Sequence, residues 1–330
     1  MSQDSYSAGF DFEVNPRTVA TVHYIHNHLV RTIEDLGGLV NGNEEYVIGN
    51  PGEGMGAITP PSGLSGSFAT PKAKRQYDAV DLGLSRRFAN NWFASANLTI
   101  SRLWGNYPGV ASSDEIRTPT TGTTASTPQQ SGGRIYRQGG NANRAWDLDE
   151  VLFDSHGNLD VTGRLATDRP VVLKLYGAYN FARNTQVGLF FYGGSGTPMT
   201  TYVNTTNQTE AMVEGRGDMG RTPFYNKTDL LVSHEMQMAG SKRLRFELNV
   251  LNLFNQKATR HLYNYLNRGG GAPQAASSIA LGNTNLFNGY DYRALLAATT
   301  QGADSYDPRY GKPDLFEPGT QGQFTIKLLF

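Results

Sequence analysis

The chain has 330 residues, with 29 basic and 29 acidic side chains, so its formal net charge is zero and gives no electrostatic reason to expect a nucleic-acid partner. Cysteine is absent, which excludes a disulfide framework, a thiolate metal site and a cysteine nucleophile. The sequence contains no apolar run of the roughly 18 residues that a transmembrane helix needs, and its start, MSQDSYSAGF, does not resemble a signal peptide.

The first strong pattern is the alternation in residues 90–107, NNWFASANLTISRLWGNY. The even positions from Trp92 to Trp104 are mostly apolar, whereas the odd positions are mostly small or polar. A transmembrane β-strand needs about 9–11 tilted residues with aromatic side chains at both membrane interfaces. The two tryptophans suit that requirement, although one such strand also fits the core of a soluble β-sandwich.

The same alternation recurs along the chain and predicts about nine strands. In chain order they are residues 7–14, 17–30, 74–88, 91–104, 169–182, 185–203, 224–238, 242–255 and 322–330. Residues 224–238 and 242–255 each carry several charged or strongly polar groups on one face, which is too many for a packed face and natural for a water-lined one.

The alternation also assigns side chains to faces, because neighbours in a strand point opposite ways. We expect one set to face lipid: Trp92, Leu98, Ile100, Leu175, Leu189, Leu248 and Ile326. We expect a second set to face the interior: Asn97, Thr99, Lys174, Asp229, Glu247 and Lys327.

The connections between the strands are alternately short and long. The short turns lie at 15–16, near 90, at 183–184 and at 239–241, and the long loops are 31–73, 105–168, 204–223 and 256–321. Outer-membrane barrels have brief periplasmic turns and extended outer loops. The fold class predicted is therefore all-β: part of an antiparallel transmembrane β-barrel, one domain over residues 1–330, in the bacterial outer membrane. The low-complexity stretch 117–133 within the second loop is predicted to be mobile.

The last strand, GQFTIKLLF, ends the sequence on an aromatic residue. Its apolar positions are Phe324, Ile326, Leu328 and Phe330, a pattern that resembles the C-terminal signal read by the outer-membrane assembly machinery. We expect these four residues to act as a membrane insertion signal. The assembly machinery is therefore one expected partner. Outer-membrane lipid is another, and we expect an aromatic girdle of Phe88, Trp92, Trp104 and Phe181 to contact it.

Two other motifs suggest chemistry only superficially. HYIHNH, residues 23–28, has metal-ligating side chains, but on a strand His26 and His28 share one face while His23 points the other way. GEGMG, residues 52–56, has neither the preceding buried strand nor the following helix of a phosphate loop. We therefore predict no catalytic residues, no cofactor and no metal.

Four stretches taken together resemble a known family. They are GNLDVTGRLATDRPVVLKLYGAY (157–179), GLFFYGGSGTPMTT (188–201), GRTPFYNKTDLLVSHE (220–235) and KRLRFELNVLNLFNQ (242–256), which includes the element Asn252-Leu253-Phe254-Asn255. They are similar to the C-terminal barrel of TonB-dependent outer-membrane receptors, in particular the Oar-like branch.

The resemblance implies energised uptake or recognition of an extracellular ligand, without catalysis, through a barrel of about 22 strands. In that family an N-terminal plug contacts TonB. The plug and the signal peptide are not found in this sequence, so we expect a C-terminal part of a receptor that reaches TonB only through the missing plug. The ligand is not encoded in any pattern that we can read.

Two alternatives remain open at this point. One is a complete barrel of eight strands, from 17–30 to 322–330, that acts as an adhesin or structural protein. The other is a soluble β-rich binding or hydrolytic protein. Because nine antiparallel strands cannot close on themselves, we expect the chain alone to aggregate or to remain an open, curved half-barrel.

Overall fold

The computed structural model describes all residues except 41–42, 58–67, 110–145, 147, 182–183, 208, 239, 241, 269–275 and 283. The long strands are β1 (Ser2–Asn15), β2 (Thr18–Arg31), β5 (Arg75–Ala89), β6 (Trp92–Gly105), β8 (Val171–Phe181), β9 (Thr185–Gly194), β12 (Tyr225–Gln237), β13 (Arg243–Leu251) and β16 (Gln321–Leu329). The short strands are β3 (Glu34–Val40), β4 (Asn43–Gly49), β7 (Gly163–Arg164), β10 (Tyr202–Asn204), β11 (Glu210–Met212), β14 (Thr259–Leu262) and β15 (Pro313–Phe316). The helical elements are α1 (Asp149–Leu152), α2 (Tyr292–Ala297), η1 (Gly54–Ala57), η2 (Leu286–Asn288) and η3 (Gly302–Ser305).

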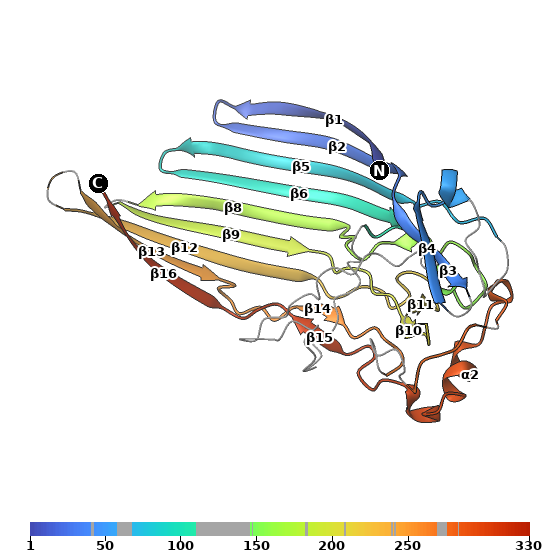
Figure 1. Cartoon of the computed structure of the whole chain (residues 1–330). Coiled ribbons are helices and arrows are strands. Elements are labelled where there is room, and N and C mark those ends of the chain that lie inside the picture. Colours follow the sequence, from blue (N-terminus) through green and yellow to red (C-terminus); the bar gives the residue numbers. More distant parts are fainter. Residues whose placement is uncertain are drawn as a thin grey trace.

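The long strands form one antiparallel sheet in the order β1-β2-β5-β6-β8-β9-β12-β13-β16, with β7 added beside β6. Figure 1 shows them side by side in a curved sheet, with the N-terminus at the end where the loops lie and the C-terminus at the opposite end. Within the described residues β1 pairs only with β2 and β16 only with β13, so the sheet has two open edges. The structure therefore has the open, curved sheet that the sequence predicts.

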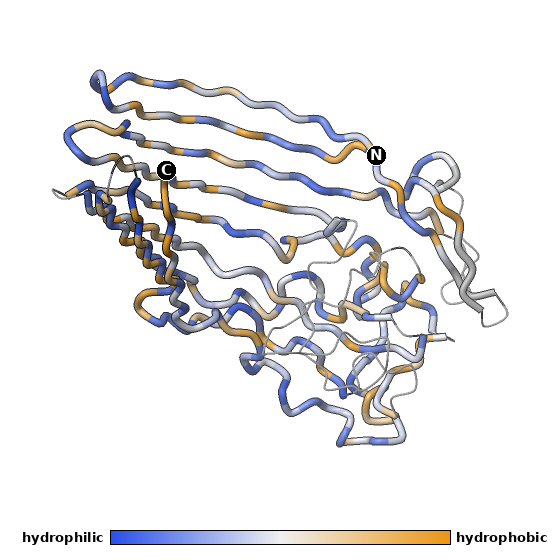
Figure 2. The backbone as a smooth tube through the Cα atoms, turned by 60° about the vertical axis from the view of Figure 1, so that its left-hand side comes forward, coloured by the Kyte–Doolittle hydropathy of each residue, from blue (hydrophilic) through white to orange (hydrophobic). Residues whose placement is uncertain are grey.

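The register sorts the side chains onto two chemically different faces. Phe10, Val22, Leu82, Leu98 and Leu173 stand side by side across five neighbouring strands on one face. On the other face Asn180, Gln186, Ser233, Glu247 and Thr325 form a polar row across five strands. The expected lipid set and the expected interior set each fall on a single face, and Figure 2 shows the resulting change of hydropathy along each strand.

The apolar face is exposed along the sheet. Leu189 is 52% exposed, Leu248 41% and Leu175 39%. A soluble protein buries such a face against a second layer, so this face argues against the soluble alternative. No helix in the described parts of the chain is long and apolar enough to cross a membrane.

Three of the predicted strand boundaries were wrong. The strand predicted at 242–255 ends at Leu251, because a turn follows it. The first strand is not the short segment 7–14 but spans Ser2–Asn15, and it pairs with β2 almost throughout. The strand predicted at 185–203 ends at Gly194, because the chain there leaves the sheet, and β10 resumes only at Tyr202. Residues 195–203, SGTPMTTYV, are rich in threonine and end in Tyr202 and Val203, residue types that are common in strands, but here they belong to the loops, where Met199 and Thr201 are buried.

The tight turns use residues that tolerate a left-handed backbone. Asn90 and Asn91 have φ values of 52° and 70°, the pair of positive angles found in a two-residue type I′ hairpin turn. The resembling element at 252–255 is also a turn, since Asn252 and Asn255 both have a φ of 51°. Asn252 is buried, and its side-chain amide donates to the carbonyl oxygens of Gln256 and Pro318, so this turn fixes the approach of the chain to β16.

The described parts of the four long loops gather beyond one end of the sheet (Figure 1). They contribute the two-stranded sheets β3–β4, β10–β11 and β14–β15, and the helices α1 and α2. We call this assembly of residues 32–74, 106–170, 195–224 and 252–320 the loop body. The predicted mobile stretch 117–133 lies outside the described residues.

An introduced charge should lower stability by different amounts on the two faces of the sheet. Leu98→Arg places a cation on the apolar face near the middle of β6, where it is expected to destabilise the protein in a bilayer by about 2–4 kcal/mol. Thr99→Arg, one residue along on the polar face, is expected to have a much smaller effect. Denaturant titration of both variants in phospholipid vesicles measures the difference, and equal losses would contradict the assignment of faces.

Candidate functional site

The polar face of the sheet carries a ladder of charges across β12, β13 and β16. Arg243 Nη1 donates to Glu235 Oε2 at 3.0 Å, and Arg245 donates to the other oxygen of Glu235. Glu247 Oε1 lies 3.6 Å from Arg245 Nη1, and its Oε2 lies 2.6 Å from Lys327 Nζ, so Glu247 links the two cations. Because every carboxylate has cationic partners on neighbouring strands, the ladder stabilises the register while leaving a polar wall.

A second cluster of polar groups lies near the loop end of β2 and β5. Tyr24 Oη donates to Asp78 at 2.9 Å, and His26 Nδ1 lies 2.7 Å from the same carboxylate. His23 points to the other face and pairs with Asp11 at 3.2 Å. The histidines of HYIHNH are thus divided between the faces as expected, and among the described residues no three side chains gather as metal ligands.

One buried carboxylate ties the loop body to the sheet. The side chain of Asp168 is 0% exposed. It accepts the backbone N–H of Leu103 in β6 at 2.6 Å, together with the guanidinium groups of Arg164 and Arg221. Arg221 also donates to the carbonyl oxygen of Gly196 at the end of β9. A buried carboxylate needs such partners, so the ends of β6 and β9 are held to two of the long loops.

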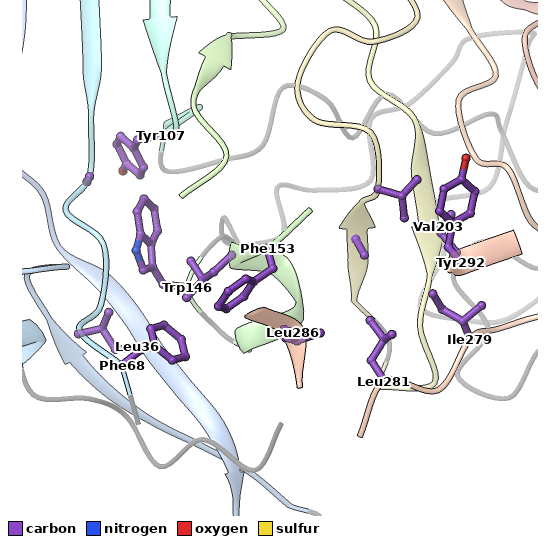
Figure 3. Close-up of a cluster of buried hydrophobic side chains, with 14 of the residues drawn as sticks. Leu36, Phe68, Tyr107, Trp146, Phe153, Val203, Ile279, Leu281, Leu286 and Tyr292 are labelled. Carbon is purple, nitrogen blue, oxygen red and sulfur yellow. The ribbon is translucent and has the colours of Figure 1, made fainter. Parts of the chain in front are cut away.

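The loop body has a hydrophobic core of its own (Figure 3). Phe153, Val203, Leu281, Leu286 and Leu296 are all fully buried in it. The cluster also contains Leu29 from β2, and Ala73 and Tyr107, which lie next to β5 and β6. The loops therefore pack as a folded unit continuous with the strand ends.

A buried acidic side chain organises the centre of the loop body. Glu150 of α1 is 0% exposed and accepts hydrogen bonds from the hydroxyl groups of Thr205 and Thr209. Asn207 Nδ2 donates to its other oxygen at 3.0 Å. These contacts fix α1 against the β10–β11 turn, which determines where the segment after β11 runs.

That segment forms one wall of a cavity of about 550 Å³ in the loop body. The lining residues come from two segments of the loop body, 195–224 and 252–320. They are Thr201, Glu214, Asp218, Leu266, Tyr292, Arg293, Tyr306 and Tyr310. Small-molecule sites are typically about 300–1,000 Å³ in volume. The sequence analysis named none of these residues, because their meeting depends on packing between distant segments.

The residues predicted to act in membrane insertion or in the aromatic girdle lie along the edge strand β16 and near the ends of β5, β6 and β8. Phe330 is 86% exposed, and Phe324, Ile326 and Leu328 of β16 are exposed on one face. Phe88, Trp92 and Phe181 are exposed at the turn end, while Trp104 is half-buried at the loop end. The structure shows these positions but does not test their roles in insertion or as a girdle, which remain predictions.

Comparison with known proteins identifies the family. No protein-family model matches the chain. Over 260 residues, or 77% of its length, the chain is 34% identical to the TonB-dependent transporter Oar of Myxococcus xanthus. This similarity relates the chain to the TonB-dependent transporters, a family of bacterial outer-membrane proteins. The matched region is 21% of the Oar protein, so the chain corresponds to only a fraction of that relative.

Two solved Escherichia coli structures are also similar to this chain. The ferric-catecholate import receptor Fiu, in its closed form, matches with a TM-score of 0.39 and 10% identity over 82% of this chain and 25% of its own. The outer membrane transporter YddB matches with a TM-score of 0.45 and 11% identity over 79% of this chain and 30% of its own.

Buried tyrosines give the loop body a predicted pH limit. Burial raises the pKa of Tyr107 and of Tyr263 to about 12, and the neighbouring Asp307 carboxylate contributes to the shift at Tyr263. Their ordinary pKa is about 10. A folded-state pKa above the unfolded value means stability that is fully present below about pH 10 and is lost as the pH rises toward about 12.

We therefore expect the near-ultraviolet circular dichroism of the loop body to persist to about pH 10 and to decay above it. Phenolate absorbance should show late-ionising tyrosines, and Tyr263→Phe should remove one of them. A titration in which every tyrosine ionises together near pH 10 would contradict the burial described.

Proposed function

We propose that the chain forms the C-terminal part of the barrel wall of a TonB-dependent transporter that takes up an extracellular ligand with energy supplied through TonB. The observation that carries the proposal is the 34% identity to a TonB-dependent transporter over 77% of the chain. TonB is reached through a plug contributed by the rest of the transporter.

The open edges of the sheet support a larger barrel. An unpaired strand edge in lipid leaves backbone N–H and C=O groups unsatisfied, at several kcal/mol for each group. β1 and β16 both present such edges, and they run in the same direction because they are the first and last of nine strands that alternate in direction. Further antiparallel strands between β1 and β16 would satisfy both edges and give the even number typical of single-chain barrels.

The eight-stranded alternative is disfavoured by the pairing of β2. One edge of β2 bonds to β1 and the other to β5, so β2 has no free edge on which β16 could close. The interior of so small a barrel would also have to hold the charge ladder of β12, β13 and β16, whereas the interior of an eight-stranded barrel is just wide enough for side chains.

The proposed orientation places the loop body outside the cell and the tight turns in the periplasm. β16 then runs toward the periplasm, and Phe330 reaches the inner interface of the membrane. The apolar face contacts lipid, with Phe88, Trp92, Trp104 and Phe181 at its two borders. The polar face, including Lys174, Asp229 and Glu247, lines the path of the ligand into the barrel.

The proposal is tested on the protein isolated from outer membranes in detergent. It should bind the periplasmic domain of TonB from the same bacterium, and unheated samples should migrate as a barrel larger than 330 residues can form. A compact, heat-modifiable monomer of this chain alone, without affinity for TonB, would favour a self-contained barrel instead.

The insertion signal makes a separate prediction. Phe330→Ser should lower the amount of protein in the outer membrane several-fold, because the assembly machinery would no longer recognise the final strand, without changing ligand affinity of the protein that does insert. Phe316→Ser provides the matched control, since Phe316 is also exposed but lies on β15 in the loop body. Unchanged membrane levels of Phe330→Ser would remove the proposed signal.

A further inference from the structure

The cavity in the loop body brings together two kinds of surface. Tyr292, Tyr306 and Tyr310 supply aromatic rings and Leu266 an aliphatic wall. Tyr306 is 39% exposed, whereas Tyr292 is largely buried in the core, so the aromatic lining runs from the mouth inward. Rings of this kind offer large apolar faces to a ligand at little entropic cost.

The polar groups of the cavity are held in place by contacts with one another. Asp218 accepts the backbone N–H of Thr201 at 2.8 Å and also its hydroxyl group, and that hydroxyl lies 2.6 Å from Tyr310 Oη. Tyr292 Oη donates to Glu214 Oε1 at 2.6 Å. These side chains are therefore positioned before any ligand arrives, which lowers the entropy cost of binding.

Arg293 supplies hydrogen-bond donors at the same site. Its Nε donates to Tyr292 Oη at 3.1 Å, and its guanidinium lies 5.5 Å from the ring centre of Tyr292. A guanidinium has five N–H donors in a fixed plane. Within the described chain this contact occupies only the Nε–H, and the side chain is exposed, so the remaining donors are available to a ligand.

The charges around the cavity restrict the chemistry of that ligand. Glu214 and Asp218 disfavour an anion, while Arg293 disfavours a cation, and His156 Nε2 lies 4.0 Å from Glu214 Oε2 at the edge of the site. The carboxylates accept hydrogen bonds and the guanidinium donates them. A neutral ligand with many hydroxyl groups, each both donor and acceptor, can bond to the two carboxylates and to the guanidinium without placing a like charge beside any of them.

The tyrosine hydroxyls hold the polar groups of the cavity in place. Burial raises the pKa of Tyr292 and of Tyr310, and the hydrogen bond to Glu214 raises that of Tyr292 further. Both phenols therefore remain protonated at physiological pH, with Tyr292 hydrogen-bonded to Glu214 and Tyr310 to Thr201.

We propose that this cavity binds a neutral oligosaccharide, whose sugar rings stack on Tyr306 and whose hydroxyl groups bond to Glu214, Asp218 and Arg293. The proposal rests on the proposed function in placing the loop body on the ligand-facing side of the membrane. A ligand bound by the loop body at the extracellular end of the barrel is the ligand that the barrel then takes up. The proposal therefore names the substrate class of the transporter.

The test is calorimetric titration of the detergent-solubilised protein with maltotriose, cellotriose and chitotriose, and with citrate and spermidine as an anionic and a cationic probe. At least one trisaccharide should bind, and neither charged probe should. Tyr306→Ala should weaken the trisaccharide about tenfold or more, whereas Tyr306→Phe, which keeps the ring, should retain most of the affinity.

Arg293→Gln should also weaken the trisaccharide about tenfold, and Arg87→Gln, an exposed arginine at the turn end, serves as its control. Failure of all three trisaccharides to bind, a preference for citrate or spermidine, or binding unchanged by Tyr306→Ala and Arg293→Gln would each overturn the proposal. None of these outcomes depends on TonB or on transport, so the proposed function can stand while this inference fails.

Discussion

In hydrocarbon, every backbone N–H and C=O must find its partner inside the protein, and most features of this chain follow from that constraint. The nine long strands satisfy one another through continuous antiparallel pairing, and among the described residues the outer edges of β1 and β16 stay unpaired. The side chains are then free to divide by face, with apolar rows on one side and the charge ladder from Glu235 to Lys327 on the other. Where the chain leaves the sheet, irregular backbone requires other partners, and Asp168 and Asn252 supply them.

The sheet was predictable from the sequence because its signals are local. Alternation along residues 90–107 determines the faces of β6, and a pair of asparagines at 90–91 marks the turn that sets its register with β5. The short and long connections order the strands, since each hairpin partner is the next strand in the chain. The errors occurred at boundaries: residues 195–203 after Gly194 were read as strand, although they pack into the loop body.

The loop body was not predictable by the same reasoning. Its core joins Phe153, Val203, Leu281 and Leu286, residues up to 133 positions apart whose spacing follows neither the period of a helix nor that of a strand. Contacts such as Glu150 with Thr205 depend on how separate loops fold against each other. The cavity inherits that dependence, so tyrosines and carboxylates scattered over residues 214–310 gave no recognisable motif before the structure brought them together.

The continuity of the loop core with the strand ends has an evolutionary consequence. Leu29, Ala73 and Tyr107 belong to the same buried cluster as the residues of the outer loops. Recombination that exchanges a single loop with a related gene would therefore leave a mismatched core at the rim of the barrel. Changes of ligand preference are more readily reached through point substitutions at exposed positions such as Tyr306 and Arg293, or through joint inheritance of all the loops. Divergence among such proteins should accordingly concentrate on the cavity surface while the packing beneath it changes slowly.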